Sequence, residues 1–307
     1  MLAMSEDGWT AANVPDQSGK TMVITGANSG IGFEASRVLA QRGARLVMAV
    51  RRPDAGEVAA GIIRTEVPEA EVLVEECDLG DLASIQRCAG RIAETVGSVD
   101  VLINNAGIMA VPYGTTTDGH ERQLGTNHLG HFALTGRLLP RLLESERGRV
   151  VTVSSDAHRF GRVDPENLDG DRYRRWGAYG RSKLANLLFA YELDRKARSA
   201  GVALTSVACH PGYAATNLQG RAARERGRSG QIWKLGHRFA QSAADGALPT
   251  LRAATDPDAG GGSYFGPTGR QRGPAGLVRS SGRSHDTGTA GRLWEISEQL
   301  TGVRFRF

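Results

Sequence analysis

The sequence predicts an α/β fold in which one domain forms a doubly wound parallel sheet of about seven strands. Three observations lead to this prediction. Short apolar segments alternate with amphipathic segments of helix length, as they do in repeated βαβ units. A glycine-rich segment follows the first apolar segment directly. A chain of 307 residues is also long enough to bury one large core.

The apolar segments predict the strands in chain order, because strands covered on both faces are apolar throughout. These strands are expected at residues 22–25, 46–50, 72–75, 99–103, 150–153 and 202–208. Amphipathic helices are expected at 33–42, 56–65, 82–96, 120–144, 178–199 and 243–254. A Gly-, Ser- and Arg-rich stretch at 260–291 is expected to hold one short strand around Tyr264, before a closing helix near 293–300.

The chain divides into a polar N-terminal leader, residues 1–18, and a single α/β domain, residues 19–307, for which the motifs described below predict dinucleotide binding and catalysis. Loops above the carboxyl ends of the strands are expected to select the substrate, at 109–119, 156–176 and 213–238. Arginines gather in the third loop, at 221–228. They could contact an acidic or lipophilic substrate, or they could belong to a solvated lid.

Composition excludes several functional classes. The net charge of +5 comes from basic residues that are spread along the chain, so no nucleic-acid partner is expected. Three cysteines without metal-ligand spacing indicate neither a disulfide framework nor a metal site. No stretch is long and apolar enough for a membrane span or a signal peptide, so the expected location is cytoplasmic.

The glycine-rich segment TGANSGIG, residues 25–32, has the context of a phosphate-binding turn in a Rossmann fold. Gly26 permits a tight turn, Gly30 permits close approach of the pyrophosphate, and Gly32 permits the helix to pack close to the sheet. The alternative is an ordinary glycine-rich turn. The residues expected to cradle the cofactor are Gly26, Asn28, Ser29, Gly30, Ile31 and Gly32.

The end of the second strand predicts a preference for NADP(H) over NAD(H). An acidic residue there binds the ribose 2′-hydroxyl of NAD, whereas an arginine can pair with the 2′-phosphate of NADP. Here Val50 ends the strand and Arg51 follows it. The alternative is that Arg51 and Arg52 are solvated loop charges.

The glycine spacing Gly-x-x-x-Gly-x-Gly resembles that of the short-chain dehydrogenase/reductase family. The other motifs of that family occur in its order: Asn104-Asn105-Ala106-Gly107, Asn127, Ser155, Tyr179-x-x-x-Lys183, and His210-Pro211-Gly212 followed by Thr216. The segments SSDAHRFGRV, AYGRSKLANLLF and LWEISEQLTG resemble the branch that contains retinol dehydrogenases and related actinobacterial reductases.

Tyr179 and Lys183 lie four residues apart, so they share one face of a helix. A free tyrosine has a pKa of about 10. A cation at roughly 5 Å is expected to lower that pKa by about two units, which would make Tyr179 an acid/base near neutrality. Taken alone, such a pair is more often a packing aromatic and a solvated charge, but the accompanying motifs favour the acid/base pair here.

The resemblance implies a reversible transfer of the pro-S hydride between nicotinamide and a carbonyl or alcohol carbon. Ser155 then binds the substrate oxygen, with Ser154 as the alternative, and Asn127 either holds a water in a proton relay or is a satisfied helical residue. His128 and His131, beside Asn127, are read as packing or surface residues. The further cofactor contacts that the resemblance implies are Asp78, Leu79, Asn105, Ala106, Gly107, Pro211, Gly212 and Thr216.

Two alternatives concern the function and assembly of the whole chain. A non-catalytic dinucleotide sensor or scaffold could use the same fold. The substrate stays open among retinoids, steroids, polyketides and small aldehydes. A homodimer or homotetramer is expected through helices 120–144 and 178–199, because residues 184–193 are more apolar than one buried stripe requires. Burial of that segment beneath the C-terminal residues is the other explanation.

Overall fold

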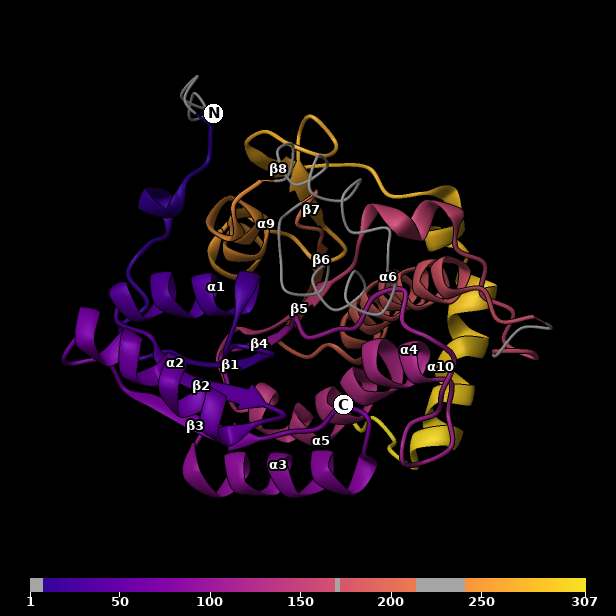
Figure 1. Ribbon diagram of the computed structural model, residues 1–307, viewed down its shortest axis with the longest axis horizontal. Coiled ribbons are helices and arrows are strands. Elements are labelled where there is room, and N and C mark those ends of the chain that lie inside the picture. Colours follow the sequence, from indigo (N-terminus) through magenta and orange to yellow (C-terminus); the bar gives the residue numbers. More distant parts are fainter. Residues whose placement is uncertain (1–7, 169–171, 214–240) are drawn as a thin grey trace, which may run out of the picture.

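A computed structural model describes residues 8–168, 172–213 and 241–307 of the chain, and its centre is a sheet of eight strands (Figure 1). The spatial order is β3-β2-β1-β4-β5-β6-β7-β8. All neighbours are parallel except β7 and β8. The strands are β1 (Thr21–Thr25), β2 (Arg45–Val50), β3 (Val72–Glu76), β4 (Val101–Asn104), β5 (Gly148–Val153), β6 (Leu204–Cys209), β7 (Tyr264–Pro267) and β8 (Ala275–Leu277).

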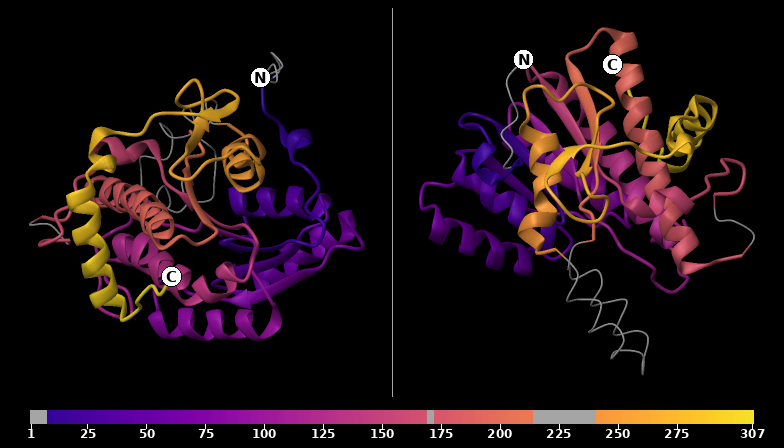
Figure 2. Two further views of the ribbon diagram at one scale, coloured as in Figure 1. Left: turned by 180° about the vertical axis from the view of Figure 1, so that it is seen from behind. Right: turned by 90° about the horizontal axis from the view of Figure 1, so that it is seen from above.

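Helices cover both faces of this sheet, which confirms the predicted doubly wound Rossmann-like fold (Figures 1 and 2). One face carries α1 (Gly30–Gln41), α2 (Pro53–Glu66) and α9 (Ala243–Thr255). The other carries α3 (Leu82–Thr95), α5 (Gly130–Leu143) and α6 (Arg175–Ala200), with α10 (Thr287–Thr301) packed on α6. The strand order reverses between β1 and β4, where ligands bind in folds of this kind.

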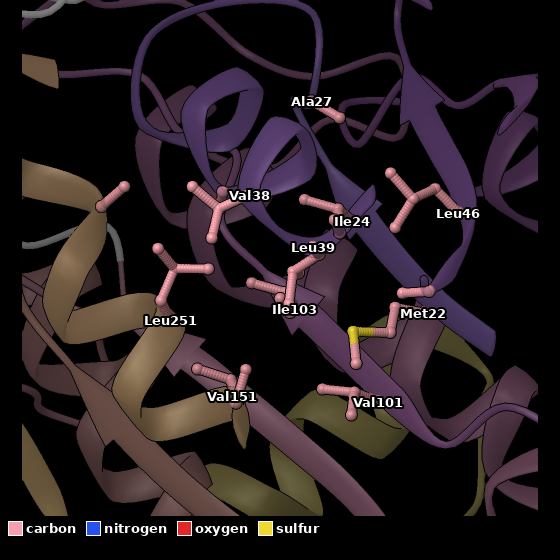
Figure 3. Packing of buried hydrophobic residues seen from close by; sticks show 14 of the residues in the cluster. Met22, Ile24, Ala27, Val38, Leu39, Leu46, Val101, Ile103, Val151 and Leu251 are labelled. Carbon is pink, nitrogen blue, oxygen red and sulfur yellow. The ribbon is translucent and has the colours of Figure 1, made fainter. Parts of the chain in front are cut away.

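Alternating residues of the central strands fill the two cores. Met22 and Ile24 of β1 point into one core, beside Leu39 of α1 and Leu251 of α9 (Figure 3). Val23, between them, belongs to the core on the opposite face. This two-sided burial explains why the strands read as continuous apolar runs.

The segment predicted as one helix over 120–144 contains one irregular turn. α4 (Arg122–Leu124) continues through one turn of π-helix (Gly125–Leu129) into α5, and the backbone stays in the right-handed helical region at both junctions. A π-turn adds one residue to a single turn of the helix, and the apolar pattern of the sequence did not reveal it.

Three further elements differ from the sequence prediction. The sheet has an eighth strand, β8, because the glycine-rich stretch after β7 turns back in an antiparallel hairpin. The expected loop 156–176 begins with a 3-10 helix, Asp156–Phe160. The closing helix α10 begins earlier than predicted, at Thr287, where the Asp286 carboxylate accepts a hydrogen bond from the Thr289 amide.

The end of the chain covers the apolar segment 184–193. Leu184 and Leu188 pack against Leu293 of α10, and Phe189 stacks on Trp294 with ring centroids 5.8 Å apart. The apolar excess of α6 is therefore buried within the chain, as the second of the two sequence explanations had it. The observation that suggested an oligomer through this face thus has another cause.

The described part of the expected leader also packs on the domain. Val14 is buried against the α1 core, and the Gln17 amide donates to the Arg42 carbonyl oxygen. Within 8–168, 172–213 and 241–307, no helix combines the length and apolar character that crossing a membrane requires.

Candidate active site

The glycine-rich turn packs too closely against the β4 end to accept side chains. Gly26 and Gly30 have φ of +65° and +58°, in the left-handed region that favours glycine. A Cβ at Gly26 would lie 3.0 Å from the Ala106 Cβ, and one at Gly32 would lie 2.5 Å from the Asn105 side-chain nitrogen. Asn28, Ser29 and Ile31 complete the turn, so all six predicted cradle residues lie together at the start of α1.

Thr25 joins this turn to the Asn105-Ala106-Gly107 segment. Its hydroxyl accepts hydrogen bonds from the amides of Asn105 and Ala106, at 2.9 and 3.0 Å. The Asn105 side chain donates to the Thr25 carbonyl oxygen. His131 of α5 contacts the same hydroxyl through Nε2 at 2.9 Å. The two halves of the expected cofactor cleft are thus fixed to each other.

Asn127 lies in the π-turn, and its side chain is fully hydrogen-bonded. Oδ1 accepts from the Ile108 amide at 2.8 Å, and Nδ2 donates to the Ile108 carbonyl oxygen and to the Ser182 hydroxyl. These contacts satisfy the amide, and the predicted relay role of Asn127 stays a prediction. A Cβ at Gly107 would lie 3.1 Å from Asn127 Oδ1 and 3.5 Å from Lys183 Nζ, so these three residues meet.

The two adjacent serines after β5 have different partners. The Ser154 hydroxyl is buried and donates to the Lys183 carbonyl oxygen at 2.7 Å. Ser155 is half-buried; its hydroxyl accepts a hydrogen bond from the Ala157 amide at 3.2 Å and lies near enough to the Tyr179 hydroxyl to lower the pKa of that tyrosine. Ser155 is therefore the serine that the fold brings to the tyrosine hydroxyl.

Tyr179 and Lys183 lie together on α6, but the lysine points mainly to the sheet. Its Nζ donates to the Val153 carbonyl oxygen at 3.0 Å and lies 5.9 Å from the centroid of the Tyr179 ring. Both side chains are buried. The geometry agrees with the predicted shared helix face.

The expected direction of the Tyr179 pKa shift is wrong for the cofactor-free chain. Burial raises the pKa of Tyr179 above 10, and the neighbouring Ser155 hydroxyl opposes this rise only in part. Burial also lowers the pKa of Lys183, to about 8, against a small opposing effect of Cys209. Loss of solvation is the main cause of both pKa shifts, and neither shift includes an attraction between the two groups.

At the end of β2, Val50 is buried and Arg51 is exposed. The Arg51 side chain makes no hydrogen bond or ion pair with the part of the chain that the structure describes. Asp78 lies just beyond β3, where its carboxylate accepts from the Gly80 amide, and the neighbouring Leu79 is buried.

The His210-Pro211-Gly212 turn follows β6 and packs on the β7–β8 hairpin. Gly212 has φ of +68°, and a Cβ there would lie 2.5 Å from the Gln271 carbonyl oxygen. Its amide donates to His210 Nδ1, which holds the turn closed. Thr216, the arginines at 221–228 and nearly all of the expected loop 213–238 lie outside the described residues.

One residue of the expected substrate loops, Trp176, lies beside Tyr179. Its ring meets the Tyr179 ring edge to face, with centroids 6.1 Å apart, and it is 41% exposed. Tyr113 and Tyr173 form another edge-to-face pair. The Tyr173 hydroxyl donates to the Val111 carbonyl oxygen and accepts from Gln123, which joins the first two substrate loops.

Comparison with known proteins identifies the family to which these features belong. The model of the short chain dehydrogenase family matches residues 20–227. The chain belongs to the short-chain dehydrogenase family. Retinol dehydrogenase 12 of Mus musculus is 42% identical over 290 residues, which cover 94% of this chain and 88% of the mouse protein. The human retinol dehydrogenase 12 is 41% identical, with the same two coverages.

Two solved structures illustrate how widely the fold is shared. A crystal structure of a protein from Mycobacterium Paratuberculosis has a TM-score of 0.81 at 47% identity, and the match covers 98% of this chain and 100% of that chain. A short chain dehydrogenase from Escherichia coli CFT073, complexed with NADPH, has a TM-score of 0.63 at 23% identity, with coverages of 81% and 97%. The second likeness shows the fold alone.

These comparisons confirm the family resemblance, including its retinol dehydrogenase-like branch. The chain is an oxidoreductase that acts on an alcohol or carbonyl group, and proteins of its family bind NAD(P). Sequence reasoning missed several residues that shape the site. Thr25 and Ser182 are inside recognised motifs, which could have drawn attention to them, whereas Gln123 carries no local signal.

Proposed function

We propose that the chain is an NADP(H)-dependent oxidoreductase that interconverts a carbonyl compound and an alcohol, with Tyr179 as the acid/base. The observation that carries this proposal is the position of Ser155 beside Tyr179, close to Lys183 and Gly107. Three elements, β5, α6 and the segment after β4, bring these groups to one place at the carboxyl edge of the sheet. A proton donor and an oxygen-binding hydroxyl are what carbonyl reduction requires of the protein.

In the reductive direction, the substrate oxygen lies between the two hydroxyl groups. Ser155 donates a hydrogen bond that stabilises the negative charge developing on that oxygen. Tyr179 then gives its proton to the oxygen, and Lys183 stabilises the resulting phenolate. Burial favours the protonated tyrosine, which suits it to act as the acid. The nicotinamide, when bound, supplies the hydride or accepts it.

The residues present fit a dinucleotide. Side chains at Gly26 or Gly32 would fill the space between the turn and the β4 end, so the close approach there is built into the backbone. Asp78 and Leu79, the Asn105–Gly107 segment, and Pro211 and Gly212 would surround the remainder of the cofactor, with Thr216 proposed from the motif alone. Asn127 would act by holding Ile108 in place.

The preference for NADP(H) is supported by the charge at the end of β2. Arg51 is exposed and, among the described residues, has no partner to compete with a phosphate. Its planar guanidinium can form two hydrogen bonds with a 2′-phosphate. No carboxylate ends the strand to repel that group.

Exposed aromatic side chains on two of the expected substrate loops support a substrate with an apolar body. Tyr113, Phe160 and Trp176 are all at least 41% exposed. The loops 109–119, 156–176 and 213–238 are proposed to select that substrate. Two relatives are named retinol dehydrogenases. Retinal therefore belongs in the substrate panel, beside steroid ketones, polyketides and small aldehydes.

The test is oxidation of NADPH with this panel by the wild type and by Tyr179→Phe. The substitution removes only the hydroxyl, so we expect turnover to fall by about 10² to 10⁴-fold while NADPH binding is retained. A variant that keeps more than half of the wild-type rate would contradict the role of Tyr179. Binding of NADPH without turnover of any compound by the wild type would favour a sensor.

The remaining parts of the proposal concern location, division of the chain and assembly. Three free cysteines support a reducing, cytoplasmic location. The catalytic domain is taken as 19–307, preceded by the leader. A homodimer or homotetramer would need an interface outside the α6 surface that α10 covers. Light scattering at micromolar concentration tests assembly, and a monomer would contradict it.

A further inference from the structure

The turn that follows Ser155 packs closely on α6. Ser155 precedes the 3-10 helix Asp156–Phe160, which packs directly on α6. A Cβ at Gly161 would run into the Gly180 carbonyl oxygen, and one at Gly180 would lie 2.7 Å from the Phe160 ring. The position of this turn on α6 therefore sets the position of Ser155 relative to Tyr179.

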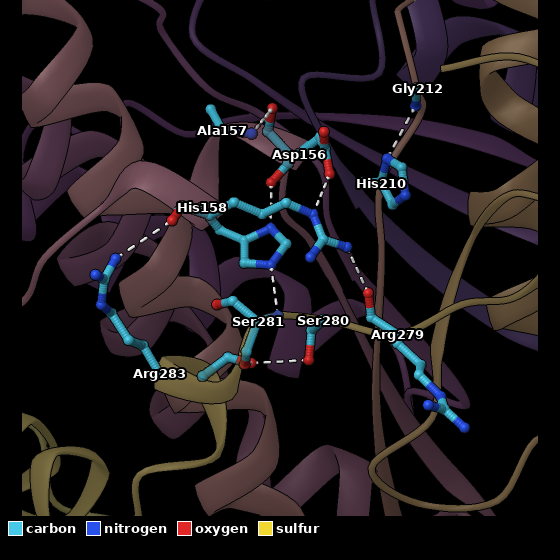
Figure 4. A network of polar contacts seen from close by, with 12 residues as sticks. Asp156, Ala157, His158, His210, Gly212, Arg279, Ser280, Ser281 and Arg283 are labelled. Carbon is cyan, nitrogen blue, oxygen red and sulfur yellow. Dashed lines mark hydrogen bonds and ion pairs between the residues drawn. The ribbon is translucent and has the colours of Figure 1, made fainter. Parts of the chain in front are cut away.

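Residues 279–283 hold the outer side of the same turn (Figure 4). The Arg159 guanidinium donates to the Arg279 carbonyl oxygen at 2.6 Å. In the opposite direction, Arg283 donates to the carbonyl oxygens of Arg159 and Gly161, at 3.3 Å each. These contacts join two segments about 120 residues apart in the sequence.

His158 is the inner member of this network. Its Nδ1 lies 2.7 Å from the Ser155 carbonyl oxygen, and its Nε2 lies 3.0 Å from the Ser281 amide nitrogen. A carbonyl oxygen can only accept and an amide N–H can only donate, so Nδ1 carries the hydrogen and Nε2 accepts. The imidazole is fully buried and must be neutral to make both contacts.

We infer that His158 is a positioning residue for Ser155, because its imidazole connects the Ser155 main chain to the 279–283 segment. It does not touch the substrate oxygen itself; it acts through the turn that presents the Ser155 hydroxyl to Tyr179. This inference rests on the proposed function, since it assumes that Ser155 binds that oxygen.

A pH dependence follows from the tautomer. Protonation would place a hydrogen on Nε2, facing the Ser281 N–H, and this contact would be lost. Burial lowers the pKa of His158 below 6.5; Arg159 and His285 also lower it, whereas the Ser155 contact and Asp156 raise it. The charged and titratable groups that face the imidazole are Asp156 and Arg159 on its own turn, His210 after β6, Tyr264 on β7, and Arg283 and His285 beyond residue 281.

Ser281 offers a matched pair of variants. Its φ of −73° is one that proline adopts, so Ser281→Pro removes the N–H donor without requiring a new backbone angle there. The Ser281 hydroxyl has no partner among the described residues, so Ser281→Ala removes a group that makes no hydrogen bond. We expect the alanine variant to match the wild type. The proline variant should lose about ten-fold in kcat, because small displacements of reacting groups are costly, with the Kd for NADPH within about two-fold of wild type.

The second measurement is the pH profile of kcat for carbonyl reduction, with the most active compound of the panel. In this direction Tyr179 acts as the acid, so its titration does not produce a loss of rate at low pH. We expect the wild-type rate to fall at acidic pH with an apparent pKa below 6.5. His158→Gln places an uncharged amide near the Nε2 position. We expect this variant to have a lower kcat than the wild type near neutral pH and to show no decrease in kcat at acidic pH.

The outcomes separate this inference from the proposed function. If Ser155→Ala keeps more than half of the wild-type rate, the proposed role of Ser155 is wrong. A second outcome is that Ser155→Ala is inactive while Ser281→Pro has the same kcat as Ser281→Ala. If circular dichroism shows that the proline variant is folded, this outcome means that His158 does not position Ser155. If the proline variant does not fold, the pH profile of His158→Gln decides, and an unchanged acidic limb overturns the inference.

Discussion

Ser154 and Lys183 are joined by a hydrogen bond of 2.7 Å from the serine hydroxyl to the lysine carbonyl oxygen. This contact fastens the segment after β5 to the third turn of α6, one residue before the serine that lies beside Tyr179. The two adjacent serines thus divide two tasks, attachment and chemistry.

The division predicts different effects on activity for two alanine variants. Ser154→Ala should lower the free energy of unfolding by about 1 kcal/mol, the usual net value of one hydrogen bond, and should keep most of the activity. Ser155→Ala removes the cap of the 3-10 helix and should cost a similar amount of stability, but it should also lose at least ten-fold in kcat, because the developing charge loses a donor. Urea unfolding and NADPH oxidation measure the two effects. A loss of activity in the Ser154 variant alone would reverse the assignment.

The parts of the site that lie close together in the sequence could be predicted from it. The turn at 25–32 follows a strand directly, and Tyr179 and Lys183 are four residues apart on one helix, so local geometry determines both. The contact of His158 with Ser281 spans 123 residues and has no local pattern. The predicted direction of the Tyr179 pKa shift was wrong for a related reason, since burial depends on the tertiary structure rather than on sequence spacing.

The fold, too, was predicted well where local sequence determines it and less well where distant pairing does. Strands buried on both faces have a strong apolar signal, so β1 to β6 were predicted within two residues at each end. The three residues of β8 contain one glycine and lie in a glycine-rich stretch, so only their pairing with β7 makes them a strand.

Trp294 anchors α10 to the helices beneath it. Its ring lies 4.5 Å from that of Phe305 and 5.1 Å from that of Phe132, measured between centroids, and it is 5% exposed. Trp294→Ala should therefore lower the free energy of unfolding by about 3 to 5 kcal/mol. Leu300→Ala on the same helix is the control. Because Leu300 is 38% exposed, this substitution should change the free energy of unfolding by no more than about 0.5 kcal/mol. Equal effects in denaturant titrations would show that α10 is not held by this cluster.

Three buried histidines predict a loss of stability at acidic pH. Burial lowers the pKa of His128 to about 3 and those of His131 and His210 to about 4. The unfolded chain binds a proton at each of these residues near pH 6.5, and the folded chain does not. Their contribution is therefore complete above pH 6.5 and decreases as the pH falls toward 4.

The free energy of urea unfolding between pH 7 and 5 measures this effect. Near pH 5, the slope of this free energy against pH should include a contribution from about three protons, which these residues take up when the chain unfolds. His128→Gln keeps a polar group near Ser297, which His128 Nε2 contacts at 3.0 Å, and removes one titration. We expect its slope to be smaller by about one proton. An unchanged slope would show that His128 is protonated in the folded chain.

Arg51 should decide the choice between the two dinucleotides. A charge-assisted contact with the 2′-phosphate is worth roughly 1.5 to 3 kcal/mol, which corresponds to a preference of about 10- to 150-fold for NADPH in kcat/KM. Arg51→Ala should remove most of that preference by lowering kcat/KM for NADPH alone, since NADH has no 2′-phosphate for the arginine to contact. Arg51→Lys is the matched variant, because it keeps the charge but loses the two-pronged geometry, and it should be intermediate. Equal kcat/KM for the two cofactors in the wild type, or a preference unchanged in the alanine variant, would rule out this role for Arg51.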